Sequence, residues 1–438
     1  MRKIYSFLGF AALLFVLSSC LEETCDAVYT YVRYEPVVIE GAAFRNDIVA
    51  EAPRSVCHPS GFAAAGDYLF MIERGEGIHL LNNNRAGNPE AVSFLPVTGA
   101  HSLIVRDGRL YVNNYVDLLV FDISDPARPT MLSRTEDVFD AYSTFVGQDG
   151  KKYFTVNYTE TTTREDIPCS SGRRQNYLQY GDAIMVSEDI IAARPQSVAS
   201  FNGNDRTEEM LAELGIGSSL SRFALGNDYL YAVDEYSIKP VALNGGGAPE
   251  AKPQVFLGGG AETVIVENGR LYIGSESAML VFDLSNPAAP RADGSYRHVT
   301  QCDPVAVRNQ TAYVTLRTGT TCAGGTVQGL NVLDVVSLSS LQAEQSFGMH
   351  NPIGLAATDN LLFLCDNEEG LKVFDRDPAT GHLSNVITNV SNLTAHDVVV
   401  QEDRNLVMVI GPNTIQQFSY TAAGQLTALG STGHCGVE

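Results

Sequence analysis

Two segments of this chain repeat one another closely enough to constrain its fold. Residues 99–129 read GAHSLIVRDGRLYVNNYVDLLVFDISDPARP, and residues 260–290 read GAETVIVENGRLYIGSESAMLVFDLSNPAAP. The two segments align without a gap over 31 positions, of which 16 are identical. A repeat of about 40 residues that holds several short apolar strands and an Asp/Gly/Pro turn is typical of a β-propeller.

The same pattern recurs along the chain as eight similar repeats. They begin near Cys57, Gly99, Asp140, Ser219, Gly260, Cys302, His350 and Ala395. Each repeat reads as four strands: a small apolar strand, a strand centred on an aromatic residue or Leu, a strand that ends in an Asp-containing turn, and a more polar strand. The pattern predicts an all-β fold, an eight-bladed β-propeller of four-stranded antiparallel blades over residues 57–438, with seven blades as the alternative. The turn aspartates Asp122 and Asp283 are expected to cap their own backbone rather than to bind metal.

The N-terminus reads as an export signal. Arg2 and Lys3 precede a nearly unbroken apolar run over residues 4–17, which is too short for a settled transmembrane helix. Residues 17–20, Leu-Ser-Ser-Cys, resemble a bacterial lipobox, so residues 1–19 are interpreted as a signal peptide and Cys20 as the lipidated residue. Residues 20–56 then form a lipid-anchored tether and strand. Leu21 favours delivery to the outer membrane. The acidic pair Glu22 and Glu23 resembles a signal for export to the cell surface, and the alternative is that it only keeps a short tether solvated in the periplasm.

Composition restricts the class of partner. The formal net charge is −22, which argues against binding to nucleic acid or to anionic lipid surfaces. The chain has no Trp, so stacked Trp platforms for sugars are absent. No cofactor-binding motif and no nucleophile elbow occurs, so neither a cofactor nor a catalytic residue is assigned.

Several segments together resemble the LVIVD-repeat proteins, a family of cell-envelope proteins, and in particular its lipoprotein branch in Bacteroidota. The resemblance is carried by TYVRYEP, GDYLFMIERGEGIHLLNN, YVDLLVFDISDP, AYVTLRTG and LCDNEEGLKVFD, at residues 30–36, 66–83, 115–126, 312–319 and 364–375. It implies a propeller in the cell envelope and no known catalytic residues.

The cysteines divide by their place in the repeats. Cys302 at the start of repeat six and Cys322 in the loop between its second and third strands share a face, so they are a predicted disulfide; the resemblance also places two cysteines there. Cys365 lies within an apolar strand and is expected to be a buried free thiol. Cys57 has two rival partners, Cys435 and Cys25. No zinc-binding spacing occurs.

Residues just before each first strand are expected to line the mouth of the propeller channel. The candidates for a ligand site there are His58, His101, Asp140, Glu262, Asp303, His350, Asn351, His396 and Asp397. Four of them are histidines of repeats seven, eight, one and two, which are neighbours in a ring. A metal or anion site and an ordinary wet channel both fit this set, and no metal is assigned.

Two segments interrupt the repeats: an insertion over residues 157–182 and an expected short helix over residues 205–214. Loops on one face of a propeller commonly carry its specificity. The sequence therefore favours a binding, scaffold or adhesion module that presents a loop-decorated face to an envelope protein or glycan. The alternative is a polysaccharide hydrolase or lyase with its site at the channel mouth, although an enzyme is the less favoured interpretation.

Overall fold

The computed structural model describes most of the chain beyond its N-terminal segment. The described residues are 27–141, 143–167, 184–187, 222–234, 236–244, 247–258, 260–275, 277–298, 304–317, 331–412 and 414–432. Several predictions fall outside them: the signal peptide, Cys20, the helix over residues 205–214, most of the insertion, Asp303, and the Cys302–Cys322 disulfide. No helix of the described residues is long and apolar enough to cross a membrane.

The chain forms two compact bodies. One comprises Met1–Val37 and Asn157–Pro195, and the other comprises Val38–Val156 and Gln196–Glu438. The second body holds the repeats, and its sheets are called blades with the number of the repeat that forms each.

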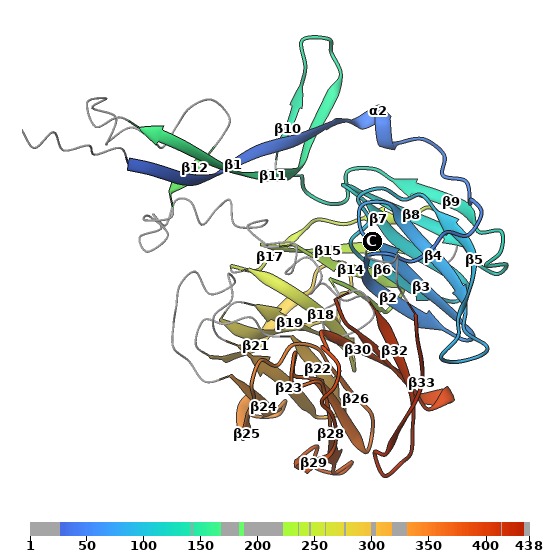
Figure 1. Cartoon of the computed structure of the whole chain (residues 1–438), viewed down its shortest axis with the longest axis vertical. Coiled ribbons are helices and arrows are strands. Elements are labelled where there is room, and N and C mark those ends of the chain that lie inside the picture. The colour runs from blue at the N-terminus through green and yellow to red at the C-terminus, as the bar shows by residue number, and fades with distance from the viewer. Residues whose placement is uncertain are drawn as a thin grey trace, which may run out of the picture. The chain divides into compact units, whose positions relative to one another are not determined.

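Blades 1, 2 and 4 come first in the second body (Figure 1). Blade 1 consists of β2 (Pro59–Ala65), β3 (Tyr68–Glu73), β4 (Gly77–Asn82) and β5 (Glu90–Leu95). Blade 2 consists of β6 (Leu103–Arg106), β7 (Arg109–Asn114), β8 (Asp117–Asp122) and β9 (Thr130–Thr135). Blade 4 consists of β13 (Phe223–Gly226), β14 (Tyr229–Val233), β15 (Ser237–Ala242), and the short strands β16 (Glu250–Ala251) and β17 (Val255–Phe256), which both pair with β15.

Blades 5 to 8 follow in chain order. Blade 5 consists of β18 (Ala261–Glu267), β19 (Arg270–Ser275), β20 (Ala278–Asp283) and β21 (Arg291–Arg297). Blade 6 consists of β22 (Val305–Arg308), β23 (Thr311–Leu316), β24 (Val332–Ser337) and β25 (Gln342–Gly348). Blade 7 consists of β26 (Leu355–Ala357), β27 (Leu361–Cys365), β28 (Leu371–Arg376) and β29 (Leu383–Val390). Blade 8 consists of β30 (Asp397–Gln401), β31 (Leu406–Ile410), β32 (Ile415–Tyr420) and β33 (Leu426–Thr432), with a 3-10 turn, η7 (Glu402–Arg404), between β30 and β31.

Local sequence explains why these strands form. The first two strands of blades 2 and 5 are joined by Asp107-Gly108 and Asn268-Gly269, and all four residues have positive φ. Two consecutive residues with positive φ define a type I′ hairpin turn, whose twist matches that of the strands it joins. The turn aspartates act as predicted, because Asp122 and Asp283 accept hydrogen bonds from the N–H groups of Ser124 and Ser285 at 2.8 and 2.6 Å. These bonds lower the pKa of both carboxyl groups.

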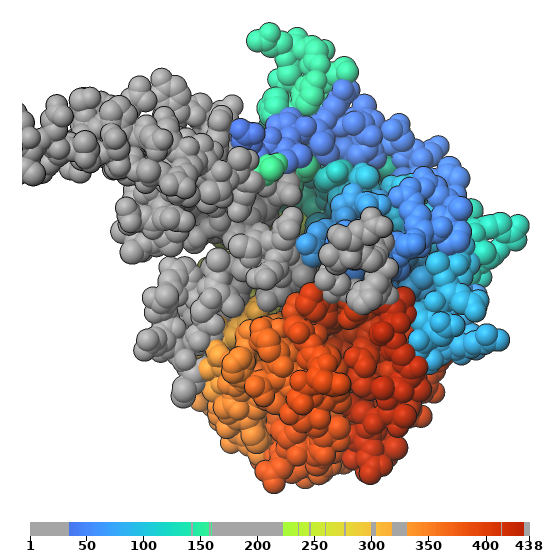
Figure 2. Space-filling model, viewed as in Figure 1, coloured from blue at the N-terminus to red at the C-terminus, as the bar shows by residue number. Residues whose placement is uncertain are grey.

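The core lies between blades rather than within them. Seven apolar clusters each combine side chains of two neighbouring blades. In one of them Phe62 and Met71 of blade 1 meet Met408 of blade 8, which joins the last blade to the first. Figure 2 shows blades 7 and 8 as adjoining orange and red surfaces.

The ring of blades closes through their first strands. Each first strand contacts those of its two neighbours, in the order β2, β6, β13, β18, β22, β26, β30 and back to β2. Blades 2 and 4 are direct neighbours, because Tyr111 and Leu118 share a core with Phe223 and Leu230. The predicted all-β propeller is confirmed, and the eight repeats correspond to eight sheets, seven of which have four strands. Within the described residues, the contacts between first strands link seven of the eight sheets.

Repeat three forms an accessory sheet with the N-terminal strand. Its strands are β10 (Ser143–Val146), β11 (Lys152–Ile167) and β12 (Ile184–Ser187), and the sheet also takes in β1 (Ala27–Glu40). The strand order is β10-β11-β1-β12, so β10 is an edge strand. In the first body, β1 lies between β11 and β12 and is antiparallel to β12. The N-terminal strand and repeat three, far apart in sequence, therefore complete one sheet.

Candidate functional site

The predicted mouth residues lie at or near the starts of first strands. His58 and His396 directly precede β2 and β30, His101 lies two residues before β6, and His350 lies in the segment that leads to β26. These four strands are consecutive in the ring. The side chains of His58, His101 and His350 are exposed, and that of His396 is partly buried. These positions are compatible with an arc of histidines along the channel mouth, which stays a prediction.

The acidic candidates are placed differently. Glu262 lies within β18, at a bulge between Ala261 and Thr263, and is partly buried. Asp397 is 1% exposed and accepts a hydrogen bond from the Val398 N–H at 2.8 Å. The Asp140 carboxylate lies 2.5 Å from Nζ of Lys239, a buried lysine of blade 4 that also lies 3.0 Å from Asp234. Within the described residues, no group of three His, Cys, Asp or Glu side chains could hold a metal ion.

A recurring polar contact, which sequence reasoning missed, fixes the mouth segments of three blades. A side chain at the end of the second strand accepts two backbone N–H groups from the segment before the first strand. Glu73 accepts those of Cys57 and His58 at 2.9 and 2.6 Å. Asn113 accepts those of His101 and Ser102, both at 2.9 Å, and Asp366 accepts those of His350 and Asn351 at 3.1 and 2.6 Å. The signal in the sequence is a polar residue that ends each apolar second strand: YLFMIE, LYVN and LFLCD.

Blade 1 holds the most developed version of this contact. Glu73 is 2% exposed and also bonds Nε2 of the fully buried His79 at 2.9 Å. Burial alone would raise the pKa of Glu73, but the hydrogen bonds from His79, Cys57 and His58 lower it below its usual value. Nδ1 of the exposed His58 lies 3.5 Å from the same carboxylate. Glu73 can therefore orient His58 while His79 stays out of reach of a ligand.

Burial and nearby charge also affect other side chains close to the mouth segments. The ammonium group of Lys372 pairs with the buried Asp366. Cys365 is a buried free thiol, as predicted, and burial raises its pKa well above its usual value. Cys57 is disulfide-bonded to a cysteine outside the described residues, so both predicted partners stay open.

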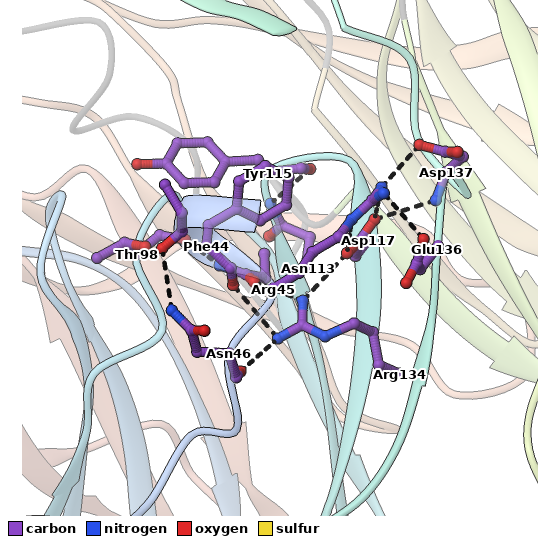
Figure 3. A network of polar contacts seen from close by, with 12 residues as sticks. Phe44, Arg45, Asn46, Thr98, Asn113, Tyr115, Asp117, Arg134, Glu136 and Asp137 are labelled. Atoms are coloured by element: carbon purple, nitrogen blue, oxygen red, sulfur yellow. Dashed lines mark hydrogen bonds and ion pairs between the residues drawn. The ribbon is translucent and has the colours of Figure 1, made fainter. Parts of the chain in front are cut away.

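The segment that precedes blade 1, residues 38–58, is attached to blades 1 and 2 and is called the strap. Asp117 of β8 is fully buried and accepts hydrogen bonds from Arg45 at 2.8 and 2.9 Å and from Arg134 at 3.0 Å (Figure 3). Arg134 also donates to the carbonyl groups of Phe44 and Asn46. Arg45 follows the short helix α2 (Gly41–Phe44) and forms further ion pairs with Glu136 and Asp137.

A hairpin formed by β10 and the first residues of β11 also contacts blade 2 and the strap. Phe154 of β11 is buried against Phe44 and Val116. Lys152 pairs with Asp137 at 2.7 Å, and Lys151 pairs with Glu40 of β1 at 2.9 Å. The hairpin is thus bound to blade 2 and to the strap by packing and by charge.

The first strand of the hairpin, β10, is exposed. All four residues of β10 are exposed, with Phe145 at 46% and Val146 at 69%. Phe145 pairs across the strands with Tyr153, and their rings stack with centroids 5.5 Å apart. The sequence points to the loops of repeat three but gives no means of identifying this strand as their exposed edge.

Comparison with known families agrees with the repeats. A model of the LVIVD repeat matches residues 99–137 and 258–298, which are blades 2 and 5 with their flanking turns. This chain contains LVIVD repeats. No relative among curated proteins matches the sequence.

Several solved structures are similar to the LVIVD-repeat chain at low identity. BamB from Moraxella catarrhalis is 8% identical, with 92% of this chain and 99% of that chain covered and a TM-score of 0.43. Sqt1 from Saccharomyces cerevisiae is 10% identical, with 92% and 98% covered and a TM-score of 0.44. PorZ from Porphyromonas gingivalis, a surface component of the type-IX secretion system, is 10% identical, with 86% of this chain and 39% of that chain covered and a TM-score of 0.45.

Proposed function

We propose that this LVIVD-repeat propeller is a lipid-anchored protein of the outer membrane that binds an envelope protein or glycan through the β10–β11 hairpin. The observation that carries the binding role is an exposed apolar strand on a fixed base. Phe145 and Val146 are open to solvent, whereas Phe154, which pairs across the strands with Thr144, is buried against blade 2. Exposed apolar residues that are held rigidly are typical of a binding surface, because little conformational entropy is lost when a partner docks.

Site-specific photocrosslinking in intact cells tests the binding role. A photoreactive residue is placed at Val146, and a matched control is placed at Phe256, which is 75% exposed on blade 4. We expect discrete adducts from position 146 and their loss when Phe145 is replaced by Ser in the same protein. Adducts that are absent from position 146, or equal from positions 146 and 256, would contradict the proposal.

The anchor is tested separately through Cys20. The lipobox-like sequence supports lipidation, so Cys20→Ala should leave an uncleaved precursor or release the protein from the membrane fraction. Protease added to intact cells distinguishes a surface protein, which is cut, from a periplasmic one, which is protected together with a periplasmic marker. Unchanged processing and fractionation of the Cys20→Ala protein would contradict the anchor.

The enzymatic alternative rests on one contact, between His58 and the buried carboxylate of Glu73. A histidine oriented by a carboxylate can act as a general base. If the protein cleaves an envelope polysaccharide, His58→Ala should abolish the cleavage and Phe145→Ser should leave it unchanged. The opposite pattern would assign the hairpin, not the mouth, to that substrate.

A further inference from the structure

Among the residues that the structure describes, no strand pairs with the outer edge of β10, which is the terminal strand of the accessory sheet. Gly147 donates its N–H to the carbonyl of Lys151 at 2.9 Å, which makes these residues a hydrogen-bonded pair. Pairs alternate along an antiparallel ladder, so the register assigns the next hydrogen-bonded pairs to Phe145 with Tyr153 and Ser143 with Thr155. The N–H and C=O groups of Thr144 and Val146 therefore point away from β11, toward the open edge.

Two outer strands of the blades are covered within the described residues. The outer strand of blade 1, for example, pairs with the strap, where Glu51 and Phe94 exchange hydrogen bonds at 2.8 and 3.1 Å. The close approach of Gly87 to Gly430 likewise places a blade 1 turn against the outer strand of blade 8. By contrast, β10 is terminal in its sheet, fully exposed, and composed of Ser, Thr, Phe and Val. Proteins commonly protect an edge with charged residues or Pro, and β10 has neither.

We infer that β10 binds an extended strand of a partner polypeptide by β-augmentation, in which the partner's main chain pairs with Thr144 and Val146. This inference rests on the proposed binding role of the hairpin and names its ligand class. Main-chain hydrogen bonds supply part of the affinity, and the stacked rings of Phe145 and Tyr153 provide an apolar surface for alternate side chains of the partner.

Charge and size determine which strand fits. Two copies of this chain, each with a formal charge of −22, repel one another. Pairing over four residues also buries far less than the roughly 800 Å² per partner of a stable interface. A cationic peptide is instead attracted by the negative net charge, and a peptide ligand does not need the buried area of a stable dimer. The partner strand is therefore a cationic, apolar-alternating segment of another protein and not β10 of a second copy.

A matched pair of variants separates main-chain from side-chain binding. The double variant Thr144→Pro and Val146→Pro removes the two edge-facing N–H donors and leaves the bonds to β11, because proline is tolerated at edge positions. The control, Thr144→Ala and Val146→Ala, removes the same side chains but keeps the N–H groups. The probe is the peptide Lys-Lys-Tyr-Phe-Thr-Val, which copies residues 151–156 and carries two positively charged side chains. In the protein itself, this segment already pairs with the inner edge of β10.

Binding of the labelled peptide to the full-length protein is measured by fluorescence anisotropy, with a scrambled peptide of equal charge as a second control. We expect the proline variant to weaken binding at least tenfold and the alanine variant to weaken it less than threefold. Slow trypsin cleavage at Lys151 and Lys152 verifies that the hairpin is intact. If the double proline variant is cleaved faster, the single Thr144→Pro variant, further from the turn, is used for the comparison.

Three outcomes would overturn the inference. They are equal loss in the alanine and proline variants, equal binding of the scrambled peptide, and a wild-type dimer in sedimentation analysis that the proline variant lacks. If crosslinked adducts at position 146 persist when Thr144→Pro is added to the protein with the photoreactive residue, the hairpin still binds a partner but not by strand pairing. If no adducts form in the wild type, the proposed function itself fails.

Discussion

Replacement of Asp117 by Ala should be among the most destabilising single changes in this propeller. The Asp117 carboxylate is fully buried and accepts four hydrogen bonds, two from Arg45, one from Arg134 and one from the N–H of Asp137. The side chains of Arg45 and Arg134 are only 15% and 10% exposed, so the variant leaves two nearly buried cations without their main counter-ion. Breaking a buried ion pair from one side costs about 3–5 kcal/mol.

The lower end of that range applies, because Arg45 keeps its ion pairs with Glu136 and Asp137. We therefore expect Asp117→Ala to lower the free energy of unfolding by about 3 kcal/mol, measured by urea denaturation. The matched control is Glu136→Ala, which removes a 57% exposed partner of the same arginine and should cost less than about 1 kcal/mol.

A double-mutant cycle with Arg45→Met isolates the pair. The double variant should be less destabilised than the sum of the two single variants by about 1–3 kcal/mol, because neither residue is then left as an unpaired buried charge. Equal effects of Asp117→Ala and Glu136→Ala, or an additive cycle, would refute the claim that the strap is held by a buried ion pair.

Three further predictions concern the propeller itself. Arg376→Met should lower the free energy of unfolding by about 3 kcal/mol, because the 2% exposed guanidinium donates to two backbone carbonyls and a tyrosine hydroxyl between blades 6 and 7; a loss below about 1 kcal/mol in urea denaturation would contradict this. The pKa of Glu73 is lowered in the folded state, so its contribution to the free energy of unfolding is present above the unfolded pKa of about 4.5 and is lost as pH falls through the folded pKa. In urea denaturation between pH 7 and pH 3, the free energy of unfolding of Glu73→Gln should therefore depend less on pH than that of the wild type, and an unchanged pH dependence would refute the role of Glu73. Gly370→Ala should be much more destabilising than Gly75→Ala, since both glycines have positive φ but only at Gly370 would a Cβ overlap a carbonyl, that of Val390; similar melting temperatures of the two variants would argue against it.

The sequence predicts the strands and turns of each blade well, and it predicts less well which sheets are neighbours in the fold. The repeat from Gly99 to Pro129 fixes strands, turns and the capping role of Asp122, because these depend on local periodicity and on residues two positions apart. Which sheets adjoin depends on contacts between distant segments, such as the core that joins Tyr111 to Phe223. Repeat three has strand-like sequence, yet it pairs with the N-terminal strand β1, and no periodicity within either segment indicates that pairing.

The candidate site also has features that the sequence predicts and features that it does not. Placement of His58 and His101 near the starts of first strands follows from repeat alignment alone. The burial of Glu73 and its bonds to two N–H groups depend on a side chain at the far end of the next strand, and the sequence records only that this residue is polar. The exposed edge of β10 depends on strand order within a sheet, which a single sequence does not specify.

The strap has a mechanical consequence. Tension that enters the chain from the N-terminal side of Val38 meets α2 and Arg45 before it can reach β2, the first strand of the ring. The contacts of Arg45 and Arg134 with Asp117, and the Glu51–Phe94 bridge further along, lie on different blades and must be broken in sequence. Pulling therefore loads blade 2 first and spares blade 1, whose loss would open the ring. A propeller of this design resists a pull on its N-terminal end without unravelling from that end.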